Sequence, residues 1–142
     1  MYNNMFNANA GVICALMSEV TIEQRRECRK HMNAAFVKLL AIEAKNNVYW
    51  TGTQTDLVEL AYHAYVDGVV RDTTGRPLPF KQLAAMVCAK LHVVMPCNVY
   101  KSAAAAIHRK GMRCPTMEER YCWMRLFAHI DEPLMQDLRF IG

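Results

Sequence analysis

Apolar residues recur at three- and four-residue steps through most of this 142-residue chain, and segments that alternate between apolar and polar residues are nearly absent. This spacing places the apolar side chains on one face of a helix and therefore predicts an all-α fold. The chain can form a hydrophobic core, because 53% of its residues are hydrophobic and it has the length of one domain. We expect a compact domain of about five helices.

Capping and stop signals divide this pattern into five helices. Capping boxes begin at Thr21 and Thr116, each followed by Gln or Glu three residues later. Thr53 and Asn98 are good N-caps, and Pro79 suits the first turn of a helix. The expected helices span residues 21–45, 53–67, 79–92, 98–110 and 116–130.

The remaining segments follow a weaker pattern. Residues 69–78 contain the turn sequence Thr73-Thr-Gly-Arg-Pro77, which leaves room for a small hairpin. A short tail at 134–141 is compatible with a helix. Residues 1–20 are rich in Asn and Ala near their start. We expect them to form an N-terminal appendage of uncertain order, attached to a single helical domain at 21–142.

The strongest functional signal is the charge of residues 71–113. Eight Lys and Arg residues stand there against one acid, Asp72, so the segment carries +7 in a protein whose net charge is +4. It also contains the helices expected at 79–92 and 98–110, joined by a short connection. A positive field on a helix pair is typical of nucleic-acid-binding modules and predicts a helix-turn-helix-like unit. A solvated basic face is the alternative.

The helix expected at 98–110 divides into two faces, as a DNA recognition helix requires. The inner face is expected to consist of Tyr100, Ala103, Ala104 and Ile107. The outer face combines Ala105 with polar side chains, so that the backbone can approach the major groove while cations reach phosphates or guanine edges. The residues predicted to contact DNA are Lys81 of the preceding helix, Asn98, Lys101, Ser102, His108, Arg109, Lys110 and Arg113.

A resemblance to a known family is carried by the block Trp50-Thr-Gly-Thr-Gln-Thr-Asp-Leu-Val-Glu-Leu-Ala-Tyr62, followed by Ala64-Tyr65 and Gly68. This block is similar to the C-terminal domain of the RteC-type regulators of tetracycline-responsive conjugative transposons. The later segments Phe80-Lys-Gln-Leu-Ala84, Asn98-Val-Tyr100 and Ile107-His-Arg-Lys110 keep the order and spacing that the resemblance predicts.

The resemblance covers roughly residues 48–124. It implies a helix-turn-helix or winged-helix-like DNA-binding domain that acts in the transcriptional control of element excision genes. Members of the family have a much larger N-terminal domain than the segment that precedes the block here. The sequence therefore predicts a DNA-binding transcriptional regulator associated with a mobile genetic element.

Signals for other chemistry are weak. The five histidines are scattered without an evident triad pattern, and the six glycines form no phosphate-binding loop, so we expect no enzyme. The six cysteines include no Cys-x-x-Cys pair. The nearest approach to zinc ligands is Cys88 with His92, completed by Cys97, and we expect neither metal nor cofactor.

The rival function is a helical interaction or dimerisation module. In that hypothesis the helices at 21–45 and 116–130 form a partner surface, and exposed Met117, Tyr121 and Phe127 fill a partner's groove. The two hypotheses overlap, since helix-turn-helix proteins commonly bind as dimers to two half-sites, which leaves a homodimer open beside double-stranded DNA as partner.

We expect no membrane association. No apolar run approaches the roughly 18 residues that span a bilayer. The apolar stretch at 11–17 lacks the preceding basic residue of a secretory signal. We therefore expect a bacterial cytoplasmic protein that is associated with the nucleoid when bound to DNA.

Overall fold

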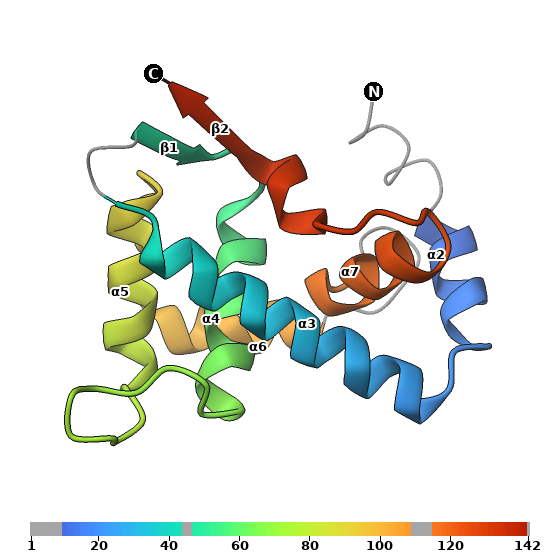
Figure 1. Ribbon diagram of the computed structural model, residues 1–142, viewed down its shortest axis with the longest axis horizontal. Helices are drawn as coiled ribbons and strands as arrows, with labels where there is room; N and C mark the ends of the chain where they lie inside the picture. The colour runs from blue at the N-terminus through green and yellow to red at the C-terminus, as the bar shows by residue number, and fades with distance from the viewer. Residues whose placement is uncertain (1–9, 44–46, 109–114, 142) are drawn as a thin grey trace.

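The computed structural model describes residues 10–43, 47–108 and 115–141. Its helices are α2 (Ala10–Met17), α3 (Ile22–Ala41), α4 (Gln54–Val66), α5 (Phe80–Lys90), α6 (Val99–Ile107) and α7 (Met117–Leu126), followed by a 3₁₀ helix, η1 (Pro133–Asp137) (Figure 1). Two short strands, β1 (Asn47–Trp50) and β2 (Leu138–Ile141), pair with each other. The expected all-α domain is confirmed.

The helices begin where the capping signals predict. Thr21 and Thr116 form complete capping boxes with residues three positions later. Thr53 Oγ1 accepts from the backbone N–H of Asp56 at 3.0 Å, and Asn98 Oδ1 accepts from that of Lys101 at 3.1 Å. Pro79 immediately precedes α5 without a side-chain cap. Local side chains thus determine where these helices start.

The end of α3 is set by a distant residue. The helix was expected to reach residue 45, but Ile42 already has extended backbone. Lys90 of α5 donates to the carbonyl oxygens of Leu40, at 2.6 Å, and of Ile42. These carbonyls lie where a helix leaves acceptors unpaired, and the ammonium also complements the negative end of the helix dipole.

Helix α4 lies at the centre of the molecule and packs against α3, α5, α6 and α7. In Figure 1, α3 crosses in front of α4 and α6 lies behind it. The predicted apolar stripe of α4 is buried at every position, namely Leu57, Leu60, Ala61 and Ala64. Asp56, Glu59 and His63 are buried with it, so this central helix also carries polar groups into the core.

The N-terminal segment contributes to the core from Ala10 onward. Helix α2 packs against α7, and Ile13 and Met17 are fully buried. Arg25 of α3 donates to the carbonyl oxygen of Met17 at 2.7 Å and anchors the end of α2. The expectation of an appendage at 1–20 is corrected for this part, because its apolar side chains complete the core; residues 1–9 lie outside the described residues.

The strands bring distant parts of the chain together. β1 and β2 are antiparallel, with Val48 opposite Phe140 and Trp50 opposite Leu138. The tail, which by sequence is compatible with a helix, forms η1 followed by a strand. Residues 69–78 do form a minimal hairpin: one β-bridge joins Arg71 and Pro77, and the backbone N–H of Asp72 donates to the Arg76 carbonyl at 2.8 Å.

The connection between α5 and α6, residues 91–98, is anchored to β1. His92 adopts the left-handed conformation, with φ of 60°, and the N–H of Val93 donates to the carbonyl of Cys88 at 2.9 Å. His92 Nδ1–H donates to the Val48 carbonyl at 3.0 Å, and its ring stacks on Tyr49 at a centroid distance of 4.1 Å. This connection consequently has a defined path although it contains no glycine.

Candidate nucleic-acid interface

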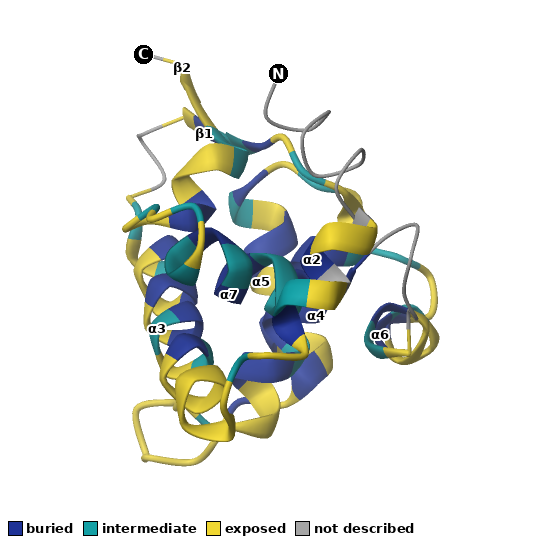
Figure 2. Cartoon of the chain, turned by 90° about the vertical axis from the view of Figure 1, so that its right-hand side faces the viewer, coloured by how far each residue is buried: buried dark blue, intermediate teal, exposed yellow. Residues whose placement is uncertain are grey.

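Helix α6 presents one continuous face to solvent. The exposed residues are Tyr100, Lys101, Ala104, Ala105 and His108, which follow one another at helical spacing. On the opposite side, Val99, Ala103 and Ala106 are buried. Figure 2 shows α6 nearly end-on, with exposed residues (yellow) on the side away from the other helices. Its outward surface thus combines two small side chains with a cation, a phenol and an imidazole.

The predicted inner face is wrong for Tyr100 and Ala104, which are exposed. The buried stripe instead begins at Val99, because this smaller apolar side chain can enter the core completely. Tyr100 keeps more than half of its surface in solvent and places its ring edge-on against Phe80 of α5. The helix is thereby turned by about one residue relative to the expectation from periodicity.

The predicted DNA-contacting residues lie as follows. Lys81, Asn98, Lys101 and His108 are exposed, and Ser102 is half-buried. The side-chain oxygen of Asn98 caps α6, so its amide nitrogen is the part left to meet a ligand. Arg109, Lys110 and Arg113 lie outside the described residues.

Two cations of the basic segment serve the fold. Lys90 caps the end of α3, as described above, and Arg71 donates to the Gly75 carbonyl at 2.8 Å within the 69–78 hairpin. The charge that the sequence concentrates in residues 71–113 is therefore divided between internal contacts and the solvent face. Lys81 on α5 and Lys101 on α6 are exposed members of this segment that were predicted to contact DNA.

An aromatic cluster joins α4, α5 and α6. Phe80 lies at its centre, with ring centroids of Tyr62 and Tyr100 each 5.4 Å away and that of Tyr65 5.8 Å away. Lys81 and Lys101 directly follow Phe80 and Tyr100 in sequence, and both are exposed on the helices that carry these two rings. Sequence reasoning missed the cluster: the spacing of Tyr62 and Tyr65 shows that they share a helix face, but three helices have to meet to form the cluster.

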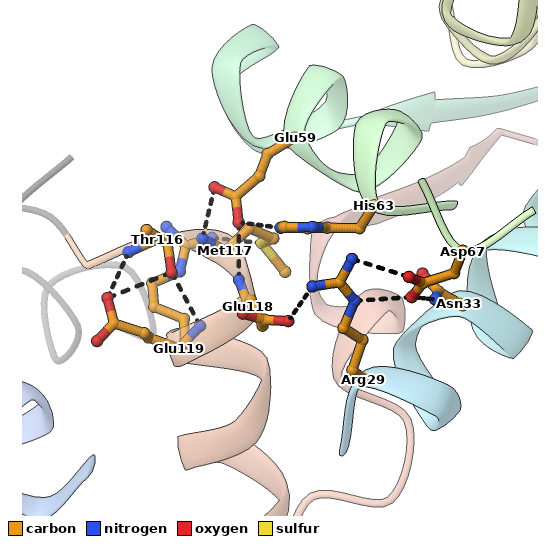
Figure 3. A network of polar contacts seen from close by, with 10 residues as sticks. Arg29, Asn33, Glu59, His63, Asp67, Thr116, Met117, Glu118 and Glu119 are labelled. Carbon is orange, nitrogen blue, oxygen red and sulfur yellow. Dashed lines mark hydrogen bonds and ion pairs between the residues drawn. The ribbon is translucent and has the colours of Figure 1, made fainter. Parts of the chain in front are cut away.

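A second group of polar residues lies at the N-terminus of α7 (Figure 3). The carboxylate of Glu59, fully buried on α4, accepts from the backbone N–H of Met117 at 2.9 Å and of Glu118 at 3.0 Å. His63 Nε2–H donates to the same carboxylate at 3.1 Å. Glu59 therefore supplies a tertiary cap to α7 and holds a negative charge at the positive end of the helix.

Arg29 of α3 connects this group to the end of α4. Its guanidinium makes a bidentate pair with Asp67, at 2.7 and 3.0 Å, and a third contact with Glu118 at 3.3 Å. Asn33 Nδ2 also donates to Asp67, at 2.6 Å. Burial lowers the pKa of Arg29, but the carboxylates of Asp67 and Glu118 have the larger combined effect. The pKa of Arg29 therefore lies above its ordinary value. These contacts join α3, α4 and α7, a structural role.

A third group joins α3 to α7. His31 Nε2 accepts from Arg125 at 3.0 Å, so its Nδ1 carries the proton and donates to the hydroxyl of Tyr121 at 2.5 Å. Burial and the charge of Arg125 lower the pKa of His31, and burial raises the pKa of Tyr121. Both groups are thereby held neutral near pH 7.

The hypothesis of a partner surface built from α7 needs correction at two residues. Met117 and Tyr121 were expected to be exposed, but both are fully buried. Phe127 retains 37% of its surface in solvent. The apolar face of α7 is occupied by α2, α3 and α4, which leaves little of it for another molecule.

Three of the cysteine thiols in the described part of the chain belong to the core. Cys28, Cys88 and Cys122 are buried, and Cys97 is exposed. Burial raises the pKa of Cys88, and burial together with the neighbouring Cys28 thiol raises the pKa of Cys122 to about 12. These protonated, enclosed thiols have the properties of small core side chains.

Comparisons with protein-family models, curated proteins and solved structures give no match to this chain. The resemblance to the RteC-type regulators consequently stays a prediction from the sequence. Within residues 10–43, 47–108 and 115–141, no three His, Cys, Asp or Glu side chains are grouped as metal ligands. None of the helices in this part of the chain combines the length and apolar character that crossing a membrane requires.

Proposed function

We propose that this protein binds duplex DNA through the exposed face of α6 and acts as a transcriptional regulator. The observation that carries the proposal is the composition of that face, where Ala104 and Ala105 lie between Lys101 near one end and His108 at the other. Small side chains let a helix backbone approach base edges in the major groove, while the flanking polar groups reach phosphates.

The support beneath α6 suits this role. α6 packs on α4 and contributes Val99 and Ala103 to the core, while α5 precedes it and ends in a turn anchored to β1. A helix held in this way can enter a groove without rearranging the core. The contact between Phe80 and Tyr100 also brings together the first turns of α5 and α6, where a helix leaves N–H groups without intrahelical partners.

The electrostatics favour a polyanion. Neither α5 nor α6 contains an acidic residue, and Lys81 and Lys101 stand near their N-termini. Helix N-termini and lysines both attract phosphate oxygens. The association with a mobile genetic element rests on the resemblance to the RteC-type regulators alone.

Fluorescence anisotropy of a labelled random-sequence duplex, at low and at moderate salt, tests the proposal. We expect binding that weakens steeply with salt, and a K81A/K101A variant whose salt slope is smaller by about 2, because two phosphate contacts are removed. The matched control is K30A/K38A, which removes two exposed lysines from α3, on the other side of α4 (Figure 1). An equal loss of DNA affinity and of salt slope in both variants would show that only net charge matters, and it would refute the assignment of the DNA-binding surface to α6.

A groove along α3 favours a second candidate, an interaction module. Its volume is about 790 Å³; Ala34, Val37 and Val69 provide apolar lining, and Arg26, Lys30 and Lys38 provide cations. The cations favour an acidic partner over a second copy of the chain, because two such faces would repel each other. Two results together would indicate an apolar interface at another surface: the protein does not bind DNA even at low salt, and it self-associates to the same extent at every salt concentration.

A further inference from the structure

Two tyrosine rings are held at the surface on a buried phenylalanine. Phe80 is 1% exposed, whereas Tyr65 of α4 and Tyr100 of α6 expose 41% and 58% of their surfaces. Both rings contact Phe80, Tyr65 at 5.8 Å in a tilted arrangement and Tyr100 at 5.4 Å edge-on. Because each ring rests on a core residue, its position is defined by packing although much of it faces water.

This arrangement leaves aromatic surface available to a ligand. Tyr62 packs edge-on against the same Phe80, with ring centroids 5.4 Å apart, and its ring lies 6.2 Å from that of Tyr65. The contact with Tyr62 further restricts the position of the Tyr65 ring. Aromatic rings that are rigid and exposed bind other flat π systems at a low cost in conformational entropy. Nucleic-acid bases stack on such rings, with about 1–3 kcal/mol lost per base when the ring is removed.

The charges around the rings indicate which flat ligand fits. Lys81 and Lys101 are exposed next to Phe80 and Tyr100 in the first turns of α5 and α6, and these two helices contain no acid. The carboxylate at the end of α4, Asp67, is neutralised by its bidentate pair with Arg29. A base linked to a phosphate backbone satisfies both features, since the base meets the rings and the phosphates meet the lysines.

We infer that Tyr65 and Tyr100 form a stacking platform for unpaired bases of a nucleic-acid strand. This inference rests on the proposed function and adds a substrate preference to it: the protein takes DNA in which single-stranded bases adjoin a duplex. The duplex lies along α6 and its unpaired strand continues over the platform. A second copy of the chain fits this surface less well, because Lys81 and Lys101 of the two copies would repel each other.

The test compares two labelled probes, a blunt duplex of about 20 base pairs and the same duplex with a single-stranded oligo(dT) tail of about 10 nucleotides, a length typical of single-strand sites. The readout is the ratio of their dissociation constants at one salt concentration. We expect the wild-type protein to bind the tailed probe about 5- to 150-fold more tightly, which corresponds to stacking of one base. An oligo(rU) tail in a parallel titration distinguishes DNA from RNA as the source of the bases.

The variants separate stacking from charge. Y65L/Y100L should bring the ratio close to one, because leucine retains apolar bulk but has no π face, whereas Y65F/Y100F should keep it. F140L removes a similarly exposed ring from β2, which packs on other elements, and should leave the ratio unchanged. K81A/K101A should weaken the binding of both probes.

Each outcome decides between the two proposals. A tail preference that survives in Y65L/Y100L, or is absent from a wild-type protein that binds the blunt duplex, overturns the platform and leaves the proposed function intact. Failure to bind either probe at low salt overturns both. Circular dichroism and thermal unfolding of every variant establish that the fold is retained; because both tyrosines are largely exposed, we expect small changes in melting temperature.

Discussion

Glu59 and Met117 lie 58 residues apart in sequence and are joined by a hydrogen bond of 2.9 Å, from the backbone N–H of Met117 to the buried carboxylate of Glu59. The same carboxylate accepts from the N–H of Glu118 and from the imidazole of His63. One side chain of the central helix thus holds the start of α7, which in turn packs against α2 and α3.

Replacing Glu59 should destabilise the whole domain. In Glu59→Gln the side chain keeps its shape, but its amide group donates where three donors need acceptors, which leaves buried groups unpaired. We expect a loss of about 3 kcal/mol in the free energy of unfolding, measured by urea denaturation. Thr116→Ala, which removes only the local cap of α7, should cost about 1 kcal/mol. A smaller loss in Glu59→Gln than in Thr116→Ala would contradict this role.

Asp137 should make stability depend on pH. Burial, aided by the nearby charge of Asp56 and opposed by that of Arg120, raises its pKa from 3.8 to about 6. The folded protein therefore binds this proton more tightly than the unfolded chain, and the contribution of Asp137 to stability falls as pH rises from about 4 to about 6.

The variant Asp137→Asn isolates this contribution, because it resembles the protonated carboxyl at every pH. At pH 7 it should be more stable than the wild type by up to about 3 kcal/mol, and near pH 4 the difference should nearly vanish. Urea denaturation of both proteins between pH 4 and pH 8 measures the difference. A constant difference across this range would show that the Asp137 carboxyl does not titrate as described.

His31 should titrate below its ordinary pKa of 6.5, because it is partly buried and its Nε2 accepts from the cation Arg125. Its contribution to stability is then complete above pH 6.5 and is lost as pH falls toward the lower pKa of the folded state. Arg125→Gln should raise the pKa of His31, and Lys38→Gln, which removes a weaker influence, should raise it less. NMR titration of the imidazole protons measures both values; an unchanged pKa in Arg125→Gln would contradict the assigned cause.

The starts of the helices from α3 to α7 follow from local sequence. The capping boxes at Thr21 and Thr116 and the N-cap at Asn98 begin helices at the predicted residues, because a side chain three positions away satisfies the first free N–H groups. The buried stripe of α4 also follows from spacing alone. For the candidate site, the sequence identified α6 as amphipathic and identified Lys81 and Lys101 as exposed residues beside it.

What the sequence alone determined is the helical class, the starts of the helices and the position of the basic segment, because these depend on residues within one or two turns of each other. Tertiary structure decided the rest. The strand pair, the use of Lys90 and Glu59 as distant caps and the outward position of Tyr100 all depend on residues far apart in the chain. These features depend on which groups compete for places in the core and for hydrogen-bond partners. The local spacing of residues does not encode that competition.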